Sequence, residues 1–425
     1  MNAEQHIWYR LDNAALIYPS IQSDRITTMF RISMTLKETV NPKILQKSLE
    51  AVIENFPFYR VRLKKGFFWY YLEHNPKLPR VERDVRYPLG RLHPRLGTRI
   101  LFRVRYWQSR IAVEFCHVLT DGTGAMTFLK ALVYDYLKRL GKDIGEPGDI
   151  PAEPLPDEAA EDAYNRFYKS PLPLPDKGRK AFHIKGILLR PGAIRITTGV
   201  IPMESILGEA KKRNVSLTTL LVAVYIDALQ ELQDMHVYKN TKKRPVAVQV
   251  PVNMRAIYPS KTLRNFSLFV IPEIDPRLGK YSFDEILQIV RETLITQTNE
   301  KAISRYLSRN VGGQRNWFVR IIPLFFKKLL MPFLYTRMGE NLCSGTLSNL
   351  GLVKLPEGMA KEVEQVDFIL GTNPINKVGC AVCGFGDKLV VNFSRSTQES
   401  KVERLFFTRL VKMGVHVKID TNYSF

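Results

Sequence analysis

The stretch FCHVLTDGTGAM, residues 115–126, joins an apolar segment to a segment with helical periodicity through a short polar corner. His117 stands at the end of the apolar run, and Asp121 comes four residues later. Gly122 and Gly124 follow directly, and glycine tolerates the tight backbone that such a corner needs. The corner has two interpretations: a catalytic base held at the end of a strand, or an ordinary strand that ends in polar residues.

The residues on the two sides of the corner predict a strand before it and a helix after it. The segment TRILFRVRYWQSRIAVEFCH (98–117) predicts two strands joined by a polar turn at 108–110. The segment TGAMTFLKALVYDYLKRLG (123–141) predicts a helix with one apolar face, and Gly141 is its stop. The local order is therefore strand, tight corner, helix.

The chemistry of the corner leaves several roles open. A neutral imidazole has a reference pKa near 6.5, so His117 can accept a proton at working pH. Asp121 either orients that imidazole directly or holds the corner in shape by pairing with a distant cation. A metal pair from His117 and Asp121 is a third interpretation, but no further ligands are evident. Cys380 and Cys383 form a lone C-x-x-C within a predicted strand, where they point to opposite faces and are poorly placed to chelate.

The composition is that of a large globular protein with a basic surface. The chain has 425 residues, is 45% hydrophobic and carries a formal charge of +22. Its length favours two domains or one large pseudo-symmetric unit, and its charge favours anionic partners without choosing among nucleic acid, lipid and phosphate-bearing cofactors. Four cysteines do not suggest a disulfide framework and the N-terminus lacks a secretory pattern, so we expect a cytoplasmic protein.

Helices and strands alternate irregularly in both halves of the chain, which predicts an α+β fold. The predicted elements are a helix at 41–56 that begins at Asn41, a helix at 214–233, a strand at 244–255, a helix at 283–294 and a hairpin at 377–394. Residues 141–180 are rich in proline and acid, which is typical of a crossover linker. We therefore predict an N-terminal half at 1–175, which carries the corner, and a C-terminal half at 181–425.

The segment NWFVRIIPLFFKKLLMPFLYT (316–336) is strongly apolar but carries three basic residues and two prolines. A spanning helix needs roughly 20 apolar residues with almost no charge, so we do not expect a membrane span here. A bent, buried helix pair is the first interpretation. A basic amphipathic segment that rests on anionic lipid is the second.

The sequence CHVLTDG (116–122) resembles the H-H-x-x-x-D-G signature of the chloramphenicol-acetyltransferase-like acyltransferases. This superfamily includes condensation domains, plant acyl-CoA acyltransferases, wax ester synthases and alcohol acetyltransferases. Further stretches resemble the superfamily in order along the chain: 45–63, 215–229, VPVNMRAIYPSKTLRNFS (250–267) and TLSNLG (346–351). Two departures stand out: Cys116 replaces the first histidine, and the D-F-G-W-G motif of the plant branch is absent.

The resemblance implies two similar α/β sandwich domains in a V-shaped pseudo-dimer with a tunnel at their interface. It implies that His117 of the HxxxDG motif is the general base, that Asp121 is structural, and that Gly122 lets the backbone turn closely. Arg255 is the implied salt-bridge partner of Asp121. The residues implied at the oxyanion or along the tunnel are Ser348, Asn349, Asn253 and Cys116.

The function implied by the resemblance is acyl transfer from acyl-CoA to an alcohol or amine, as in the alcohol acetyltransferases and wax ester synthases. Acyl-CoA would be a co-substrate, and neither a bound cofactor nor a metal is expected. One alternative is a free-standing condensation-type enzyme that takes its acyl group from an acyl carrier protein. Another is a non-catalytic basic binder of anionic lipid or nucleic acid, although we expect no specific nucleic-acid partner. A cytoplasmic location with peripheral membrane contact through 316–336 is the alternative to a purely cytoplasmic one.

Overall fold

The computed structural model describes residues 7–92, 100–170, 172–176, 178–235, 238 and 242–423. Its helices are α1 (Tyr18–Ile21), α2 (Pro42–Glu54), α3 (Gly122–Arg139), α4 (Ala163–Arg166), α5 (Met203–Lys212), α6 (Leu217–Asp234), α7 (Phe283–Gln297), α8 (Glu300–Arg315), α9 (Trp317–Ile321), α10 (Leu324–Met338), α11 (Glu357–Glu362) and α12 (Lys401–Lys412). Its strands are β1 (Trp8–Arg10), β2 (Met29–Leu36), β3 (Val61–Lys65), β4 (Tyr70–His74), β5 (Val81–Arg83), β6 (Phe102–Trp107), β7 (Arg110–Cys116), β8 (Arg195–Pro202), β9 (Val246–Asn253), β10 (Ser267–Val270), β11 (Glu273–Ile274), β12 (Gly345–Leu352), β13 (Val363–Ile369), β14 (Val378–Phe385), β15 (Lys388–Arg395) and β16 (Lys418–Thr421). The predicted α+β class is confirmed.

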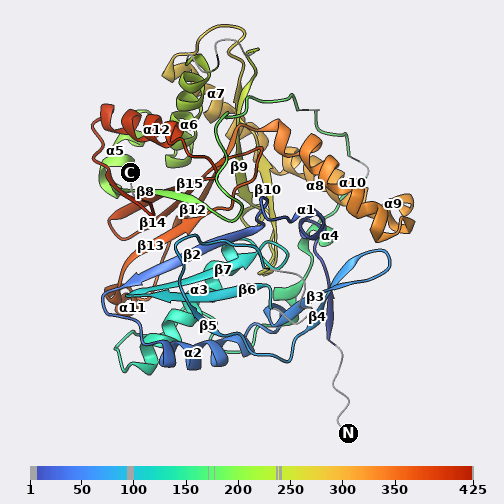
Figure 1. Cartoon of the computed structure of the whole chain (residues 1–425), viewed down its shortest axis with the longest axis vertical. Coiled ribbons are helices and arrows are strands. Elements are labelled where there is room, and N and C mark those ends of the chain that lie inside the picture. The colour runs from blue at the N-terminus through green and yellow to red at the C-terminus, as the bar shows by residue number, and fades with distance from the viewer. Residues whose placement is uncertain are drawn as a thin grey trace.

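Within the described ranges the strands form three sheets (Figure 1). The first sheet has the order β13-β2-β7-β6-β5, and the second has the order β10-β9-β12-β14-β15-β8-β16 with β11 beside β9. A small sheet, β1-β4-β3, lies at the side of the first one. The strand pair predicted at 98–117 is β6 and β7, which pair antiparallel around a turn at Gln108, whose φ is 51°.

The first sheet has one apolar face and one polar face, and both are buried. Phe30 and Ile32 of β2 alternate with Arg31 and Ser33, so the two sets point to opposite sides of the sheet. The apolar side packs under α2 and α3. On the polar side, Arg31 Nη2 lies 2.9 Å from Glu114 Oε1. Because α3 packs on the apolar face, this face supports the helix that begins at the corner.

One strand of the first sheet comes from the far end of the chain. β13 pairs antiparallel with β2, with Asp367 opposite Ser33. Asn392 of β15 donates to Asp367 at 3.4 Å, which ties the second sheet to the polar face of the first. A single division at 175–181 therefore separates most of the two halves, but β13 lies beyond that division and completes the N-terminal sheet.

The segment between the halves is mostly irregular, as its prolines predict, and it nevertheless packs on the protein. It holds a 3₁₀ turn at Asp157–Ala160 and the short helix α4, in which Tyr164 is almost fully buried. Ala159 O accepts from Leu263 N at 2.8 Å, and Glu161 O accepts from Thr262 Oγ1 at 2.8 Å. The linker thus helps to position the main chain at Thr262 and Leu263.

The second half is built around α6, the helix predicted at 214–233, whose N-cap is Ser216. α6 packs against α7 and α12 and covers one face of the second sheet. In β14, Cys380 belongs to the core under α6, whereas Cys383 belongs to the core of the first half. The two thiols therefore point to opposite faces, as predicted, and both are free.

The segment 316–336 forms two helices, α9 and α10, with a break at Pro323. The predicted bend is confirmed, but the predicted burial is wrong. Phe325 is 76% exposed and Leu329 is 73% exposed. In the described ranges no single helix is both long and apolar enough to cross a bilayer; α5 and α6 meet that length and composition only as a pair bent by 84°.

Candidate active site

The corner lies where β7 ends and α3 begins. Cys116 is the last residue of β7, and Asp121 is the N-cap of α3. Asp121 Oδ1 accepts from Thr123 N at 3.1 Å and from Gly124 N at 3.3 Å, which satisfies two of the free amides at the helix start. The aspartate of the motif is thus fixed by the helix that follows it.

His117 is held between aromatic rings. Its ring centroid lies 5.3 Å from that of Tyr18 in a stacked arrangement and 4.5 Å from that of Phe30. Its main-chain N donates to Thr28 O at 2.9 Å, and its carbonyl accepts from Asn265 Nδ2 at 2.7 Å. The position of the ring is therefore set by β2, by α1 and by a residue of the second half.

The surroundings of His117 favour the neutral ring. Burial lowers the pKa of His117 below its usual value, and it outweighs the opposing effects of the Asp121 charge and of the nearby Asn265 and Thr120 groups. Nδ1 is buried and lies outside hydrogen-bond geometry with every described residue, while the side chain as a whole keeps partial exposure. A neutral imidazole with this placement can accept a proton.

The carboxylate of Asp121 is fully occupied by groups other than the imidazole. Besides the two helix amides at Oδ1, Oδ2 accepts from Arg255 Nη1 at 2.9 Å and from Phe266 N at 2.9 Å. The Arg255–Asp121 ion pair expected from the sequence is therefore present. Of the two roles open for Asp121, this geometry corresponds to holding the corner in shape.

Arg255 is itself fixed on several sides. It lies just after β9, in a short 3₁₀ helix, Met254–Ala256. Its Nε donates to Thr262 O at 2.8 Å and its Nη2 donates to Arg264 O at 2.6 Å. Asn253 Oδ1 accepts from Arg255 Nη1 at 3.2 Å, and Asn253 Nδ2 reaches Thr123 Oγ1 at 3.5 Å. Asn253 thus supports the ion pair and the start of α3.

The segment 263–266, which we call the clamp, holds the corner in place from the second half, a role that was not predicted for these four residues. Each of its four residues contributes at least one contact. Leu263 O accepts from Thr120 Oγ1 at 2.6 Å and Tyr59 OH at 2.9 Å, Arg264 O accepts from Arg255, Asn265 donates to the His117 carbonyl, and Phe266 N donates to Asp121. Three of these residues act through main-chain atoms, and Asn265 acts through its side-chain amide. Every residue has a main-chain carbonyl and most have an amide, so contacts of this kind cannot be read from residue type.

The buried carboxylate of Asp12 contacts the segment 263–266. Asn265 Nδ2 also donates to Asp12 Oδ2 at 3.0 Å, and Arg264 Nη2 lies 3.4 Å from the same carboxylate. Burial raises the pKa of Asp12 to about 6, and the Arg264 charge opposes that rise. Asp12 was not predicted, because Arg264 and Asn265, which connect it to the corner, are more than 250 residues away.

The glycines of the corner permit close approach from both sides. A Cβ on Gly122 would lie 2.5 Å from Leu350 Cδ2 of β12, and a Cβ on Gly124 would lie 2.1 Å from Leu263 O. Both contacts are too short for any other residue without movement of the neighbour. Glycine is therefore needed at position 124, where the neighbour is a main-chain oxygen, whereas at position 122 the neighbour is the end of a flexible leucine side chain. Both residues have φ in the ordinary helical range of α3.

The remaining predicted site residues divide into those near the corner and those turned away from it. The thiol of Cys116 is buried at 3.3 Å from Thr28 Oγ1, and burial raises its pKa. Ser348 pairs with Ala381, on the side of β12 that faces the first half. Asn349 points the other way and donates to Thr218 of α6 at 3.1 Å, so the structure separates it from the corner.

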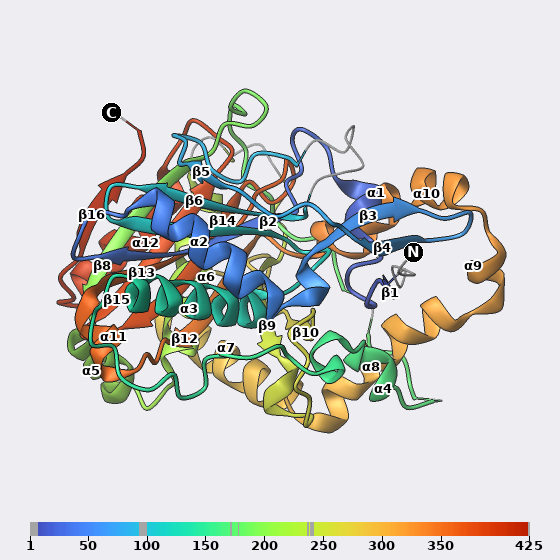
Figure 2. The ribbon, with the colours of Figure 1, turned by 90° about the horizontal axis from the view of Figure 1, so that it is seen from below.

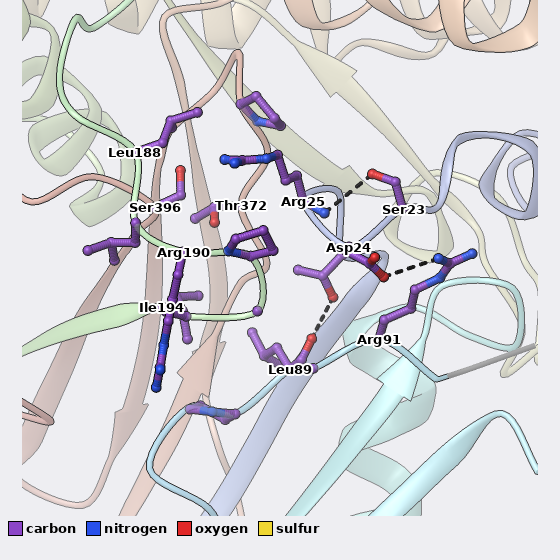
Figure 3. A pocket seen from close by; sticks show the side chains of 18 residues that line it. Ser23, Asp24, Arg25, Leu89, Arg91, Leu188, Arg190, Ile194, Thr372 and Ser396 are labelled. Carbon is purple, nitrogen blue, oxygen red and sulfur yellow. Dashed lines mark hydrogen bonds and ion pairs between the residues drawn. The ribbon is translucent and has the colours of Figure 1, made fainter.

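A pocket opens between the two halves next to the strand that supports His117 (Figure 3). Its first-half side includes Arg25, Thr27 and Arg91, and its second-half side includes Arg190 and Thr372. Thr27 directly precedes Thr28, whose carbonyl accepts from His117 N. Arg91 pairs with Asp24 at 3.2 Å, whereas neither Arg25 nor Arg190 has a carboxylate partner among the described residues. The pocket is thus basic.

Within the described part of the chain, no group of three or more His, Cys, Asp or Glu side chains is arranged to hold a metal ion. The interface tunnel stays a prediction, since the pocket described above does not include His117.

No protein-family model matches the chain, and no curated protein matches it either. Solved structures do match it over nearly its whole length. TRI101 of F. graminearum, complexed with coenzyme A and deoxynivalenol, is 10% identical with a TM-score of 0.65, covering 97% of this chain and 99% of its own. TRI3, the trichothecene 15-O-acetyltransferase of Fusarium sporotrichioides, is 12% identical with a TM-score of 0.60, and the match covers 97% of this chain and 95% of TRI3. The first condensation domain of the calcium-dependent antibiotic synthetase is 15% identical with a TM-score of 0.59, covering 97% and 99%.

These likenesses define the class of fold. The chain has the two-domain fold of the chloramphenicol-acetyltransferase-like superfamily, and the predicted resemblance is confirmed at the level of the fold.

Proposed function

We propose that this protein is an acyltransferase that moves an acyl group from acyl-CoA to the hydroxyl or amine of an acceptor. The observation that carries the proposal is a neutral, partly exposed His117 whose neighbouring Asp121 is fully engaged in holding the corner. General-base acyl transfer uses a base that is free to take the proton of the acceptor, and Asp121 holds the corner that carries this base.

In the proposed reaction, His117 takes the proton of the acceptor O–H or N–H, and the acceptor atom attacks the thioester carbonyl. The carbon–sulfur bond then breaks, and the departing thiolate takes the proton from the imidazolium. Acceptor ester or amide and free thiol are the products, so atoms and charge balance without a metal or redox partner. Asp121 moves no proton in this scheme.

The donor is proposed to be acyl-CoA for two reasons. The related folds include a protein complexed with coenzyme A and a 15-O-acetyltransferase. The basic pocket beside Thr27 offers Arg25 and Arg190 to the phosphates of such a donor, and guanidinium groups bind phosphate well. The alcohol-acetyltransferase character of the reaction rests on these supports and on the motif.

A second candidate keeps the chemistry and changes the donor to an acyl group on a carrier protein. The likeness to a condensation domain favours it. The net charge of +22 would also suit an acidic carrier. The proposed setting is the cytoplasm, where the four free thiols would remain reduced.

The test is thiol release from acetyl-CoA and longer acyl-CoAs by the purified protein, with a panel of alcohols and amines. Acceptor-dependent release should fall by about 10²- to 10⁴-fold in His117→Ala, which is the usual contribution of a general base. His416→Ala, at an exposed histidine, is the matched control and should leave the rate unchanged. Release from an acylated carrier but from no acyl-CoA would select the second candidate, and release in neither case would refute the proposal.

A further inference from the structure

Exposed large apolar side chains gather on α9, α10 and the tip of the β3–β4 hairpin. Figure 2 shows these segments side by side. We call this region the α10 surface. Its residues are Phe67, Phe68, Trp317, Phe318, Ile321, Phe325, Phe326, Leu329, Leu330, Phe333 and Leu334, each at least 40% exposed. Apolar patches of this kind on soluble proteins mark sites of interaction with another molecule.

The helix α10 shows its apolar face to the outside. Phe325, Leu329 and Phe333 follow one another at spacings of four, and a second such row lies beside them, so they form one broad stripe on the helix. The opposite face turns inward and carries Lys327, which is 6% exposed, and the half-buried Tyr335. A helix that packed on its own protein in the usual way would bury the apolar stripe and expose the lysine.

The hairpin and the helix form one preassembled surface. Phe67 O accepts from Leu324 N at 2.9 Å, and Phe68 O accepts from Lys327 Nζ at 3.1 Å. The same Lys327 Nζ lies 3.3 Å from the ring centroid of Trp69. Burial lowers the pKa of Lys327 to about 8. Two segments that are far apart in the sequence are thus joined at fixed positions, with their phenylalanines outward.

The charge of this region has one sign. Residues 301–339 contain eight Lys and Arg and no Asp or Glu. Among the described residues, none of the eight makes an ion pair with a carboxylate. Arg320, Lys328 and Arg337 are exposed within the helices that carry the apolar stripe. A positive rim around an apolar centre is complementary to a surface that is both anionic and apolar.

We propose that the α10 surface docks onto an anionic lipid bilayer, with its apolar stripe in the boundary between headgroups and acyl chains. A second copy of the chain fits this surface less well, because it would bring the same unpaired positive charges into contact. A bilayer with acidic headgroups neutralises them while its acyl chains accept the phenylalanines. Because α10 also packs against α1, whose Tyr18 stacks on His117, docking would hold the candidate active site close to the bilayer.

The experiment is flotation of the full-length protein with vesicles of phosphatidylcholine alone and of phosphatidylcholine with 30% phosphatidylserine, an amount of the order found to attract basic segments. The wild type should bind the anionic vesicles at least about tenfold more strongly than the neutral ones, and added salt should reduce the difference. The triple variant Phe325→Ser, Leu329→Ser, Phe333→Ser should lose binding to both. The triple variant Arg320→Gln, Lys328→Gln, Arg337→Gln should lose the preference for anionic vesicles.

The matched control is Ile187→Ser, Leu278→Ser, Val411→Ser, which removes three exposed apolar side chains from other faces and should bind as the wild type does. Trp317 supplies a second readout: brominated lipid should quench its fluorescence, and Trp317→Phe should abolish that part of the signal. Circular dichroism checks that each variant is folded. Equal binding by the wild type and the apolar variant would overturn the proposal, as would a vesicle-independent dimer that the apolar variant dissociates. None of these readouts depends on acyl transfer.

Discussion

Arg255 Nη1 lies 2.9 Å from Asp121 Oδ2, although 134 residues separate them. This pair joins the two halves of the protein at the point where His117 is held. Besides the ion pair, the same guanidinium donates hydrogen bonds to two main-chain carbonyl groups of the second half, at Thr262 and Arg264.

Replacing this arginine should therefore cost both stability and activity. Arg255→Ala leaves a nearly buried carboxylate uncompensated, and we expect a loss of about 3–5 kcal/mol in the free energy of unfolding. Arg255→Lys keeps the charge but cannot reproduce the planar set of N–H donors of the guanidinium, so it should recover only part of the stability. Urea denaturation and thiol release measure the two effects. Arg404→Ala, at an exposed arginine, is the control, and unchanged stability in Arg255→Ala would contradict the assigned role.

The acid limb of the activity profile should lie below pH 6.5. Burial lowers the pKa of His117, and the base is active when it is neutral, so the rate should rise with pH through that lowered pKa and be near its plateau at pH 7. The profile of kcat/KM against pH in the free enzyme reports this value. An acid limb centred at or above 6.5 would show that the ring is not desolvated as described.

The same histidine should make stability depend on pH. Its folded-state pKa is lower than its unfolded-state pKa, so the unfolded chain takes up the proton first as the pH falls. The stability that His117 contributes is present above about pH 6.5 and is lost as the pH falls through the lowered value. His117→Gln should show a smaller drop in Tm between pH 7.5 and 5.5 than the wild type, with His416→Gln as the control.

Gly124→Ala should be far more damaging than a methyl group normally is. The added Cβ would meet Leu263 O at 2.1 Å, and that oxygen belongs to the clamp and cannot swing aside. We expect a loss of about 2 kcal/mol or more, in the range given by severe overpacking. Gly208→Ala is the matched control, since that glycine is in helix α5 with nothing within 4 Å, and alanine there should stabilise the protein slightly.

The basic pocket predicts a dependence on phosphate in the donor. Arg25→Ala and Arg190→Ala should each lower kcat/KM for acetyl-CoA by about tenfold, the loss expected for one charge-assisted contact. Both variants should react at the wild-type rate with a small acetyl thioester that lacks phosphate. An equal loss with both donors would indicate that the arginines support the fold and do not bind phosphate.

Much of the site could be predicted from the sequence because it is carried by residue type. The strand, the corner and the glycines leave recognisable residues at recognisable spacings, whereas the Asp121–Arg255 pair is implied only by the resemblance to the acyltransferase family. The clamp at 263–266 could not be predicted, since it acts through carbonyl and amide groups that every residue has. Asn349 was misplaced for a simpler reason: a strand alternates its side chains, and the sequence alone did not show which face of β12 meets the corner.

The first interpretation of 316–336, a buried helix pair, is wrong for a different reason. Its apolar residues predict burial, and hydrophobic periodicity locates a stripe without saying which way it faces. The orientation is seen only in the structure, in the exposure of Phe325 and Leu329 and in the contacts of the inward Lys327.

The placement of β13 has a consequence for how the protein is made. Residues 363–369 complete a sheet whose other strands lie within the first 116 residues. During synthesis, one edge of β2 therefore stays unpaired until about 250 further residues have been made. An open strand edge invites pairing with other chains, and contacts so distant in sequence form slowly. The N-terminal half released early from the ribosome, or expressed alone, would keep that edge open, and the protein would be expected to mature only once its C-terminal segment has emerged.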